Sequence, residues 1–245
     1  MSTTLDVAVA GMALWNPDSS TRPQPSILPP NERRRAPDTV AIALQVAHEA
    51  CVTAGRDPAK LATVFASTYG DLPITDYMCA TLASAPATLS PTRFHNSVHN
   101  AAAGYWSIAT GSRMPYCALA AGPYTFGAGL LTAAVQVCAD QTDVLYVAYD
   151  TEACGPLAQV ALSRGMLGMA LVLSAAGEVP LRLHVTADPP ADSGAQAERV
   201  PDPPASANAM AAALRLHAAL RSGVPRPLTL PLGPALWLRV RVRPG

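Results

Sequence analysis

One cysteine and two histidines are the residues of this chain whose types and spacing could do chemistry. Cys117 opens the stretch CALAAGPYTFGAGLLTAA, in which small residues lead into an apolar run spaced by glycines. A thiol at the entrance of a helix is a typical arrangement for a cysteine nucleophile, because the positive end of the helix stabilises the thiolate. Such a nucleophile also needs a base, and His95 and His99 are the candidates in the chain.

His95 and His99 are four residues apart, a spacing that brings two imidazoles to one face of a helix and can bind zinc. The zinc pattern also places a glutamate directly after the first histidine, and this chain has Asn96 there. The segment is, moreover, predicted to be a loop that approaches a helix. We therefore expect no metal site here, and we expect Asn96 and Asn100 to hydrogen-bond the backbone.

The elements that position these residues belong to a chain of 245 residues, of which 50% are hydrophobic and 14% charged, with a formal net charge of +0. This length predicts one sizeable domain, alone or with a small appendage. The low fraction of charged residues has two possible explanations. Either a partner covers some of the apolar surface, or the composition is simply rich in alanine. Neutrality argues against nucleic acid as a partner, and the short Arg33–Arg35 cluster is either a solvated approach to a helix or a site for an acidic protein.

The cysteine usage and the N-terminus indicate the compartment. The five cysteines are odd in number and lack the CxxC spacing, which argues against a disulfide framework or a structural zinc site. The N-terminal MSTTLDVAVAGMALW has no basic region, so it predicts a first strand and not a signal peptide. No apolar stretch reaches the roughly 20 residues of a membrane span. We expect a reduced, cytoplasmic protein.

Apolar runs and helical periodicity predict the elements. Buried strands are predicted over 5–15, 61–70, 114–122, 142–152 and 168–175, helices over 37–55, 72–86 and 123–140, a proline-rich loop over 16–38, and a loop that leads into a helix over 91–111. Asp38 is the predicted N-cap of the first long helix, and Gly55 its stop. Strands this apolar are usually buried on both faces, which indicates an α/β layered sheet.

The character of the sequence changes after residue 176, and we expect a first domain over 1–176 and a strand–loop–helix–strand tail over 177–245. The tail is predicted to contain a strand over 181–188, a mobile proline-rich segment over 189–207, an amphipathic helix over 207–220 and a final strand within 227–244. This tail is too short to duplicate the first part of the chain.

Several segments together resemble the N-terminal half of a β-ketoacyl synthase, which has the thiolase-like fold. They are LPPNERRRAPDTVAIALQVAHEA near the start and then, in that family's order, RFHNSVHNAAAGYWSIATG, CALAAGPYTFGAGLLTAA, DVLYVAYD and MALVLS. The resemblance covers roughly residues 1–176 and extends to short, chain-length-factor-like proteins of aryl polyene pigment systems. It implies a thiolase-like layered α/β fold: the N-terminal half of a ketosynthase, with a short α+β tail in place of the C-terminal half.

The resemblance also implies that the catalytic nucleophile is missing. Active synthases of the family have approximately TACASG here, and matching the glycine to Gly122 places Leu119 where the cysteine should stand. Cys117 lies two residues upstream, a displacement of roughly 6 to 7 Å along a strand. The donors and helix terminus that would serve the nucleophile position do not reach that far. Only a shift in the matching of the two sequences would make Cys117 the nucleophile.

The family's two catalytic histidines come from the C-terminal half, which this chain lacks. His184 and His217 lie in the tail, without the glycine- and threonine-rich loop or the asparagine context of those histidines. His184 is predicted in a strand and His217 on the amphipathic helix. The resemblance therefore implies that the chain has no catalytic residues of its own.

The role implied by the resemblance is a non-catalytic, chain-length-factor-like subunit. Such a subunit forms a heterodimer, or a larger assembly, with a full-length catalytic ketosynthase in a fatty-acid or polyketide system, here aryl polyene biosynthesis. It has no cofactor of its own, and an acyl carrier protein brings the growing chain as a phosphopantetheine thioester. The alternative is a small acyltransferase or condensing enzyme that uses Cys117 as its nucleophile.

The same resemblance assigns tunnel-gating residues. In such pairs the non-catalytic subunit closes the far end of the acyl tunnel with residues of the helix before the HNSVHN loop. In this chain Ile74, Tyr77, Met78 and Thr81 would share one face of that helix. The alternative is a helix face that packs into the chain's own core.

The resemblance finally assigns an interface. It places His95, Asn96, His99 and Asn100 where the two subunits meet. A half-unit would also expose the surface that its missing half normally covers, and the helix over 207–220 would cover part of it. We therefore expect poor solubility of the chain without its partner.

Overall fold

The computed structural model describes residues 3–16, 21–161, 163–188, 208–223 and 227–242. The strands in these residues are β1 (Thr3–Trp15), β2 (Ala62–Ala66), β3 (Tyr116–Leu119), β4 (Val144–Asp150), β5 (Leu167–Ser174), β6 (Val179–Thr186), β7 (Pro227–Gly233) and β8 (Leu236–Val242). The α-helices are α1 (Pro30–Arg35), α2 (Asp38–Ala54), α3 (Leu72–Ser84), α4 (Pro91–Asn96), α5 (Ala101–Thr110), α6 (Thr125–Asp140) and α7 (Ala212–Ser222). Short 3-10 turns are η1 (Pro58–Lys60), η2 (Pro86–Thr88), η3 (Gly122–Tyr124) and η4 (Gly155–Gln159).

The described strands form one mixed sheet in the order β3-β2-β4-β5-β1-β6-β8-β7. β2 runs parallel to β3 and β4, and the other described pairs are antiparallel. The carboxyl ends of β2, β3 and β4 therefore meet at one edge of the sheet, where the loops of α/β folds commonly carry functional groups. This sheet confirms the predicted layered α/β fold.

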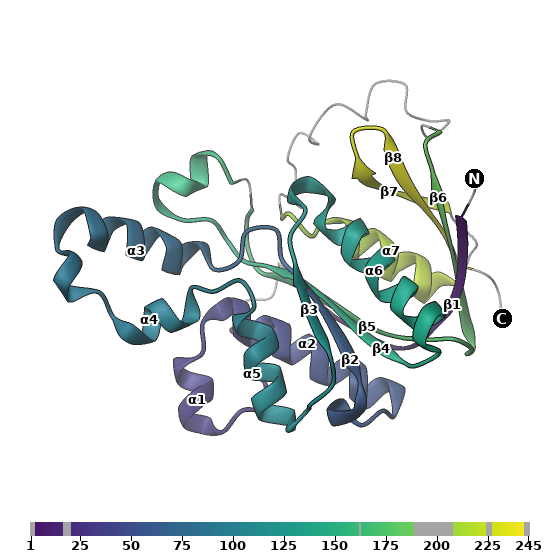
Figure 1. Ribbon diagram of the computed structural model, residues 1–245, viewed down its shortest axis with the longest axis horizontal. Helices are drawn as coiled ribbons and strands as arrows, with labels where there is room; N and C mark the ends of the chain where they lie inside the picture. The colour runs from purple at the N-terminus through teal and green to yellow at the C-terminus, as the bar shows by residue number, and fades with distance from the viewer. Residues whose placement is uncertain (1–2, 17–20, 162, 189–207, 224–226, 243–245) are drawn as a thin grey trace.

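Helices cover both faces of the sheet from β3 to β1 (Figure 1). α2 packs on one face beside α5, and α6 packs on the other. Gly11 of β1 permits the close approach of α2, because a Cβ there would lie 2.5 Å from the carbonyl oxygen of Ala50. β4 and β5 lie between the helical layers and are buried along their whole length. Burial on both faces explains why these strands are unbroken apolar runs in the sequence.

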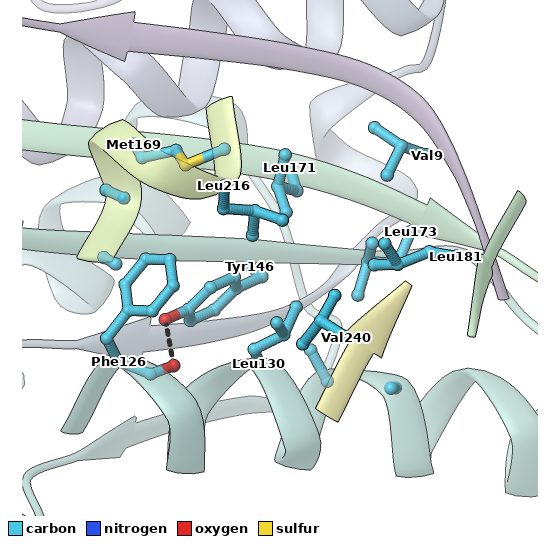
Figure 2. Packing of buried hydrophobic residues seen from close by; sticks show 14 of the residues in the cluster. Val9, Phe126, Leu130, Tyr146, Met169, Leu171, Leu173, Leu181, Leu216 and Val240 are labelled. Atoms are coloured by element: carbon cyan, nitrogen blue, oxygen red, sulfur yellow. Dashed lines mark hydrogen bonds between the residues drawn. The ribbon is translucent and has the colours of Figure 1, made fainter. Parts of the chain in front are cut away.

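The tail strands extend the sheet and then cover α6. β6 pairs with β1, and the β7–β8 hairpin continues from β6. The hairpin reaches α6 closely enough that a Cβ on Gly127 would lie 2.9 Å from the carbonyl oxygen of Pro231. Figure 2 shows the shared core, in which Leu130 of α6, Leu216 of α7 and Val240 of β8 belong to one cluster of buried side chains. The tail helix α7 therefore covers part of the α6 side of the sheet, and that a second half would otherwise cover this surface stays a prediction.

Two short helices differ from the predicted loops. α1 lies inside the predicted 16–38 loop, and α4 occupies the start of the segment predicted to lead into α5, so that His95 is helical. α4 begins with a side-chain cap, because Ser90 Oγ accepts a hydrogen bond from the Arg93 N–H at 3.4 Å. Asp38 is the first residue of α2, and the cap position belongs to Pro37. Gly55 ends α2 in a left-handed conformation with φ of 61°, as predicted.

The end of the chain also differs from its prediction. The single strand predicted within 227–244 is the β7–β8 hairpin. β7 is an edge strand of the sheet, and there Pro227 and Pro231 can be accommodated although they cannot donate backbone hydrogen bonds. The expected boundary at residue 176 falls between β5 and β6, and the segment 189–207, predicted to be mobile, lies outside the described residues.

Candidate functional site

The connection between β3 and α6 is the position at which the resemblance expects a nucleophile. Leu119 is the last residue of β3 and pairs with Ala66 of β2. Its carbonyl oxygen accepts a hydrogen bond from the Ser67 N–H at 3.2 Å. Its side chain is half-buried against the core on the α6 side of the sheet. The backbone and side chain of Leu119 are thus both engaged in packing.

A tight turn separates β3 from α6. Gly122 has a φ of 54°, a left-handed conformation that favours glycine, and begins η3. The Thr125 hydroxyl donates to the Gly122 carbonyl oxygen at 2.7 Å and accepts from the Ala121 N–H at 2.9 Å. α6 begins only at Thr125, so neither Leu119 nor Cys117 lies in its first turn.

Cys117 lies within β3 and not at the mouth of the helix. It is opposite Val64 of β2, and its half-buried side chain packs against the core on the α6 side. The His99 Nε2 atom lies 2.9 Å from the carbonyl oxygen of Ser67, beyond the end of β2, and His95 is exposed on α4. In the described part of the chain, no hydrogen bond joins either histidine to Cys117. The structure thus brings neither candidate base to the thiol.

A buried carboxylate that the sequence analysis missed organises the carboxyl ends of β2 and β4. Asp150, the last residue of β4, is 0% exposed. It accepts hydrogen bonds from the Ser67 hydroxyl at 2.7 Å, the Thr68 N–H at 2.9 Å and the Tyr69 N–H at 3.2 Å. Ser67 Oγ in turn accepts from the Gly70 N–H at 2.9 Å. These bonds fix the turn that follows β2.

The environment of Asp150 indicates a structural role. Burial raises its pKa, while the three hydrogen bonds oppose that shift because they stabilise the carboxylate. Asn208 joins the tail to this network, since its Nδ2 lies 3.3 Å from the Asp150 carbonyl oxygen and 3.2 Å from that of Gly165. Both carboxylate oxygens already accept hydrogen bonds, so Asp150 positions loops and is not free to act as a base.

The four predicted gating residues lie on α3 in two environments: Ile74 is buried, and Tyr77, Met78 and Thr81 are half-buried. The Tyr77 hydroxyl accepts a hydrogen bond from the Ser90 N–H at 3.1 Å. The Arg93 guanidinium lies 3.9 Å from the centroid of the Tyr77 ring. Tyr77 therefore packs against α4 of its own chain, as the own-core alternative required. The gating role of the four residues stays a prediction.

The four predicted interface residues are not brought together into one exposed set. Asn96 is buried, and its Oδ1 accepts from the Tyr105 hydroxyl at 3.2 Å. Asn100 Nδ2 donates to the Tyr116 hydroxyl at 3.0 Å. His95 is exposed and His99 is half-buried on the Ser67 carbonyl oxygen.

Large apolar side chains are exposed on or beside α4, α5 and β3, the elements that also carry these four residues and their partners. They are Phe94 of α4, Val98, Ile108 of α5 and Tyr116 of β3, with exposed fractions of 57%, 50%, 80% and 47%. We call these four residues the edge surface, because β3 is the last strand of the sheet on this side and pairs only with β2 among the described strands. A free strand edge next to exposed apolar side chains is typical of a surface that another protein covers.

Three general features of the described residues complete the site. Their five cysteines are all free thiols. They contain no group of three or more side chains that could hold a metal ion. None of their helices has the length and apolar character needed to cross a membrane.

Comparison with known proteins identifies the family of this fold. Residues 10–226 match the family described as β-ketoacyl synthase, N-terminal domain, whereas a search of curated proteins found no match. The ketosynthase ApeO in complex with its chain length factor ApeC, from Xenorhabdus doucetiae, is similar with a TM-score of 0.67 and 19% identity over 98% of this chain and 97% of that chain. The ishigamide ketosynthase/chain length factor is similar with a TM-score of 0.60 and 16% identity over 90% of this chain and 74% of that one.

A third solved structure shows the same fold in a longer chain. It is a type II polyketide ketosynthase with its acyl carrier protein, AntDE:AntF, with a TM-score of 0.56 and 14% identity over 71% of this chain and 64% of that chain. These identities are low, so the three likenesses show the fold alone. The family match covers most of the sequence, and this chain therefore belongs to the β-ketoacyl synthase N-terminal domain family.

Proposed function

We propose that this chain is a non-catalytic, chain-length-factor-like subunit of a ketosynthase. The observation that carries the proposal is the connection between β3 and α6, which has Leu119 where the resemblance to the family expects the nucleophile. Leucine can neither form a thioester nor be activated by a base. The tail is consistent with the same proposal, because β7, β8 and α7 pack on the α6 side of the sheet.

The partner proposed is a full-length catalytic β-ketoacyl synthase. The edge surface and the free edge of β3 support a protein partner on this side of the molecule. Two of the similar solved structures are ketosynthases with a chain length factor, and a third contains an acyl carrier protein. By analogy, a carrier protein would visit the complex and bring the growing chain as a phosphopantetheine thioester, in aryl polyene biosynthesis. The chain itself would bind no cofactor.

The proposed contribution of this chain to the acyl tunnel is α3. Met78 and Thr81 are only half-buried in the isolated chain, so a partner can cover them. Tyr77 is fixed by Ser90 and Arg93 of the α4 segment, and it would hold the helix in place while its neighbours meet the acyl chain. Bulky side chains on this face would limit the length of the product.

The second candidate is an acyltransferase with Cys117 as nucleophile. It is weaker because Cys117 lies inside a strand, packs against the core and has no histidine as a hydrogen-bond partner among the described residues. Backbone donors for an oxyanion would also have to lie beside the thiol, and α6 begins only at Thr125.

Co-expression with a full-length ketosynthase distinguishes the two candidates. The complex is purified through a tag on this chain and assayed for condensation with acyl and malonyl carrier proteins. We expect the partner to co-purify and condensation to stop only when the partner's own nucleophile is replaced. Cys117→Ala should leave condensation intact, as should the matched control Cys138→Ala, which removes another half-buried thiol. Loss of condensation in Cys117→Ala alone, with the complex still assembled, would show that Cys117 is the nucleophile.

A further inference from the structure

An open cleft lies between the arm formed by α3 and α4 and the rest of the molecule. Its volume is ≈ 900 Å³, within the roughly 300–1,000 Å³ of small-molecule sites. Its walls come from the segment before α2, the start of α3, α4 and the segments that follow β4 and precede β5, which lie on one side of the molecule in Figure 1. No residue of β3 or α6 lines it, so the cleft is separate from the connection that contains Leu119.

Three arginines line this cleft: Arg22, Arg35 and Arg93. Arg22 is engaged, because its Nε donates to Asp38 Oδ1 at 2.6 Å. Arg35 is exposed and has no ion pair or side-chain hydrogen bond within the described residues. Arg93 lies over the ring of Tyr77 and has no carboxylate partner in that part of the chain. Two guanidinium groups are therefore available to an anion.

The acidic groups of the cleft limit the charge of that anion. Asp71 is held by the fold, since Oδ2 accepts from the Thr39 hydroxyl at 2.6 Å and Oδ1 from the Ile74 N–H at 2.8 Å. Glu152 is exposed at the cleft's edge. Once Arg22 and Asp38 are paired, two arginines face two acidic residues. The cleft thus has no net positive charge, so an anion would be attracted only by direct contact with Arg35 and Arg93, and a phosphate dianion would be repelled more strongly by Glu152 than a ligand with one negative charge.

The remaining wall is polar at one point and otherwise apolar. Asn96 is 4% exposed, and its Oδ1 accepts from the Tyr105 hydroxyl, which leaves the two N–H groups of its amide without a described partner beside the cleft. Ile74 and Met166 supply apolar surface. The amide donor of Asn96, two cations and an apolar wall together suit an amphipathic anion.

We propose that this cleft binds a carboxylate at the end of an apolar chain. Arg35 and Arg93 contact the carboxylate, and Ile74 and Met166 line the hydrocarbon part. The site goes beyond the proposed subunit role and does not depend on it, because its residues all belong to this chain and none lies on β3. Ile74 connects this cleft with the proposed acyl tunnel, since it belongs both to the apolar wall of the cleft and to the predicted gating face of α3.

Calorimetric titration of the purified full chain with decanoate tests the proposal. If the chain is soluble only with its ketosynthase, the complex is titrated instead, once with the wild-type chain and once with each variant of this chain. We expect decanoate to bind and its affinity to fall with added salt. Arg35→Gln and Arg93→Gln should each weaken binding by about tenfold, because each removes a hydrogen bond to a charged group. Arg34→Gln is the matched control, since Arg34 lies on the same helix but does not line the cleft.

Two further ligands separate the contribution of charge to binding from the contribution of apolar contact. Decanol, which has the same chain and no charge, should bind more weakly than decanoate and should not respond to the arginine substitutions. Decyl phosphate should bind no more tightly than decanoate. Absence of decanoate binding at millimolar concentration, equal binding to the Arg35→Gln/Arg93→Gln double variant, or tighter binding of decyl phosphate would each overturn the carboxylate assignment.

Discussion

Asp150 accepts hydrogen bonds with both carboxylate oxygens in a site from which water is excluded. An asparagine there would turn an NH₂ group toward donors of the turn after β2 and leave them unsatisfied. We expect Asp150→Asn to lower the free energy of unfolding by about 1–3 kcal/mol at pH 7, measured by urea denaturation. Asp143→Asn is the control: it removes one partner of the surface pair with Arg56 and should cost less than about 1 kcal/mol. Similar losses in both variants would contradict the structural role of Asp150.

The same variant has a defined pH dependence. Burial raises the pKa of Asp150 above its ordinary value of 3.8, so the folded protein holds this proton more tightly than the unfolded chain. The part of the stability that comes from protonation of Asp150 is therefore full below pH 3.8 and is lost as the pH rises through the folded pKa. The difference in unfolding free energy between the wild type and Asp150→Asn should be larger at pH 4 than at pH 7. A difference that does not change with pH would contradict the raised pKa.

Residues differ in how far the sequence predicts their surroundings. Leu119 and Gly122 could be placed because the strand, the turn and the helix that define them are consecutive in the chain. Asp150 and Ser67 are distant in sequence and meet only because β2 and β4 pair in parallel. The polar residue directly after the apolar run LYVAY was the one local signal for this network. Side-chain partners set by sheet pairing could not be predicted from one sequence.

At the scale of elements, α6 owes its position on the sheet to a glycine. A Cβ on Gly129 would lie 2.6 Å from Cε2 of the buried Tyr146 and 2.9 Å from Cβ of Ala66. Gly129→Ala should therefore lower the free energy of unfolding by about 1–3 kcal/mol, measured by thermal and urea denaturation. Gly104→Ala is the matched control, because a Cβ at this position of α5 meets nothing within 4 Å. Alanine there should stabilise the protein by about 0.5–1 kcal/mol, and stabilisation by both substitutions would contradict the close packing of α6.

The elements that could be predicted are those with a strong period or a buried run. α2, α6, β4 and β5 lie within a few residues of their predicted ranges, because burial on one or both faces fixes their patterns. α1 and α4 are six residues each, too short for helical periodicity. β7 was missed because PLTLPLG contains two prolines, which argue against a strand unless it is at an edge of the sheet. Its edge position depends on a pairing order that the local sequence does not contain.

At the scale of the whole molecule, the tail changes which surface needs a partner. The α6 side of the sheet packs against β7, β8 and α7, which leaves Val135 as the large apolar side chain of α6 that is exposed among the described residues. Of the exposed large apolar side chains, those of the edge surface lie on or beside α4, α5 and β3, next to a free strand edge, while others are exposed elsewhere: Val52, Leu82, Val135, Val160 and Leu236. We therefore expect that poor solubility of the chain without a partner would depend mainly on the edge surface.

The shared core also predicts that tail and body unfold together. Leu216 of α7 is 0% exposed and packs in the cluster that contains residues of β4, β5 and α6. Leu216→Ala should lower the free energy of unfolding by about 2–5 kcal/mol, because the cavity lies between the tail and the sheet. Urea titrations are followed by fluorescence in two variants that each keep one tryptophan, Trp106 in the body or Trp237 in the tail. Leu216→Ala should lower the free energy of unfolding by the same amount in both single-tryptophan variants, since tail and body then unfold in one cooperative transition. A shift in the Trp237 curve alone would show that the tail folds as a separate unit.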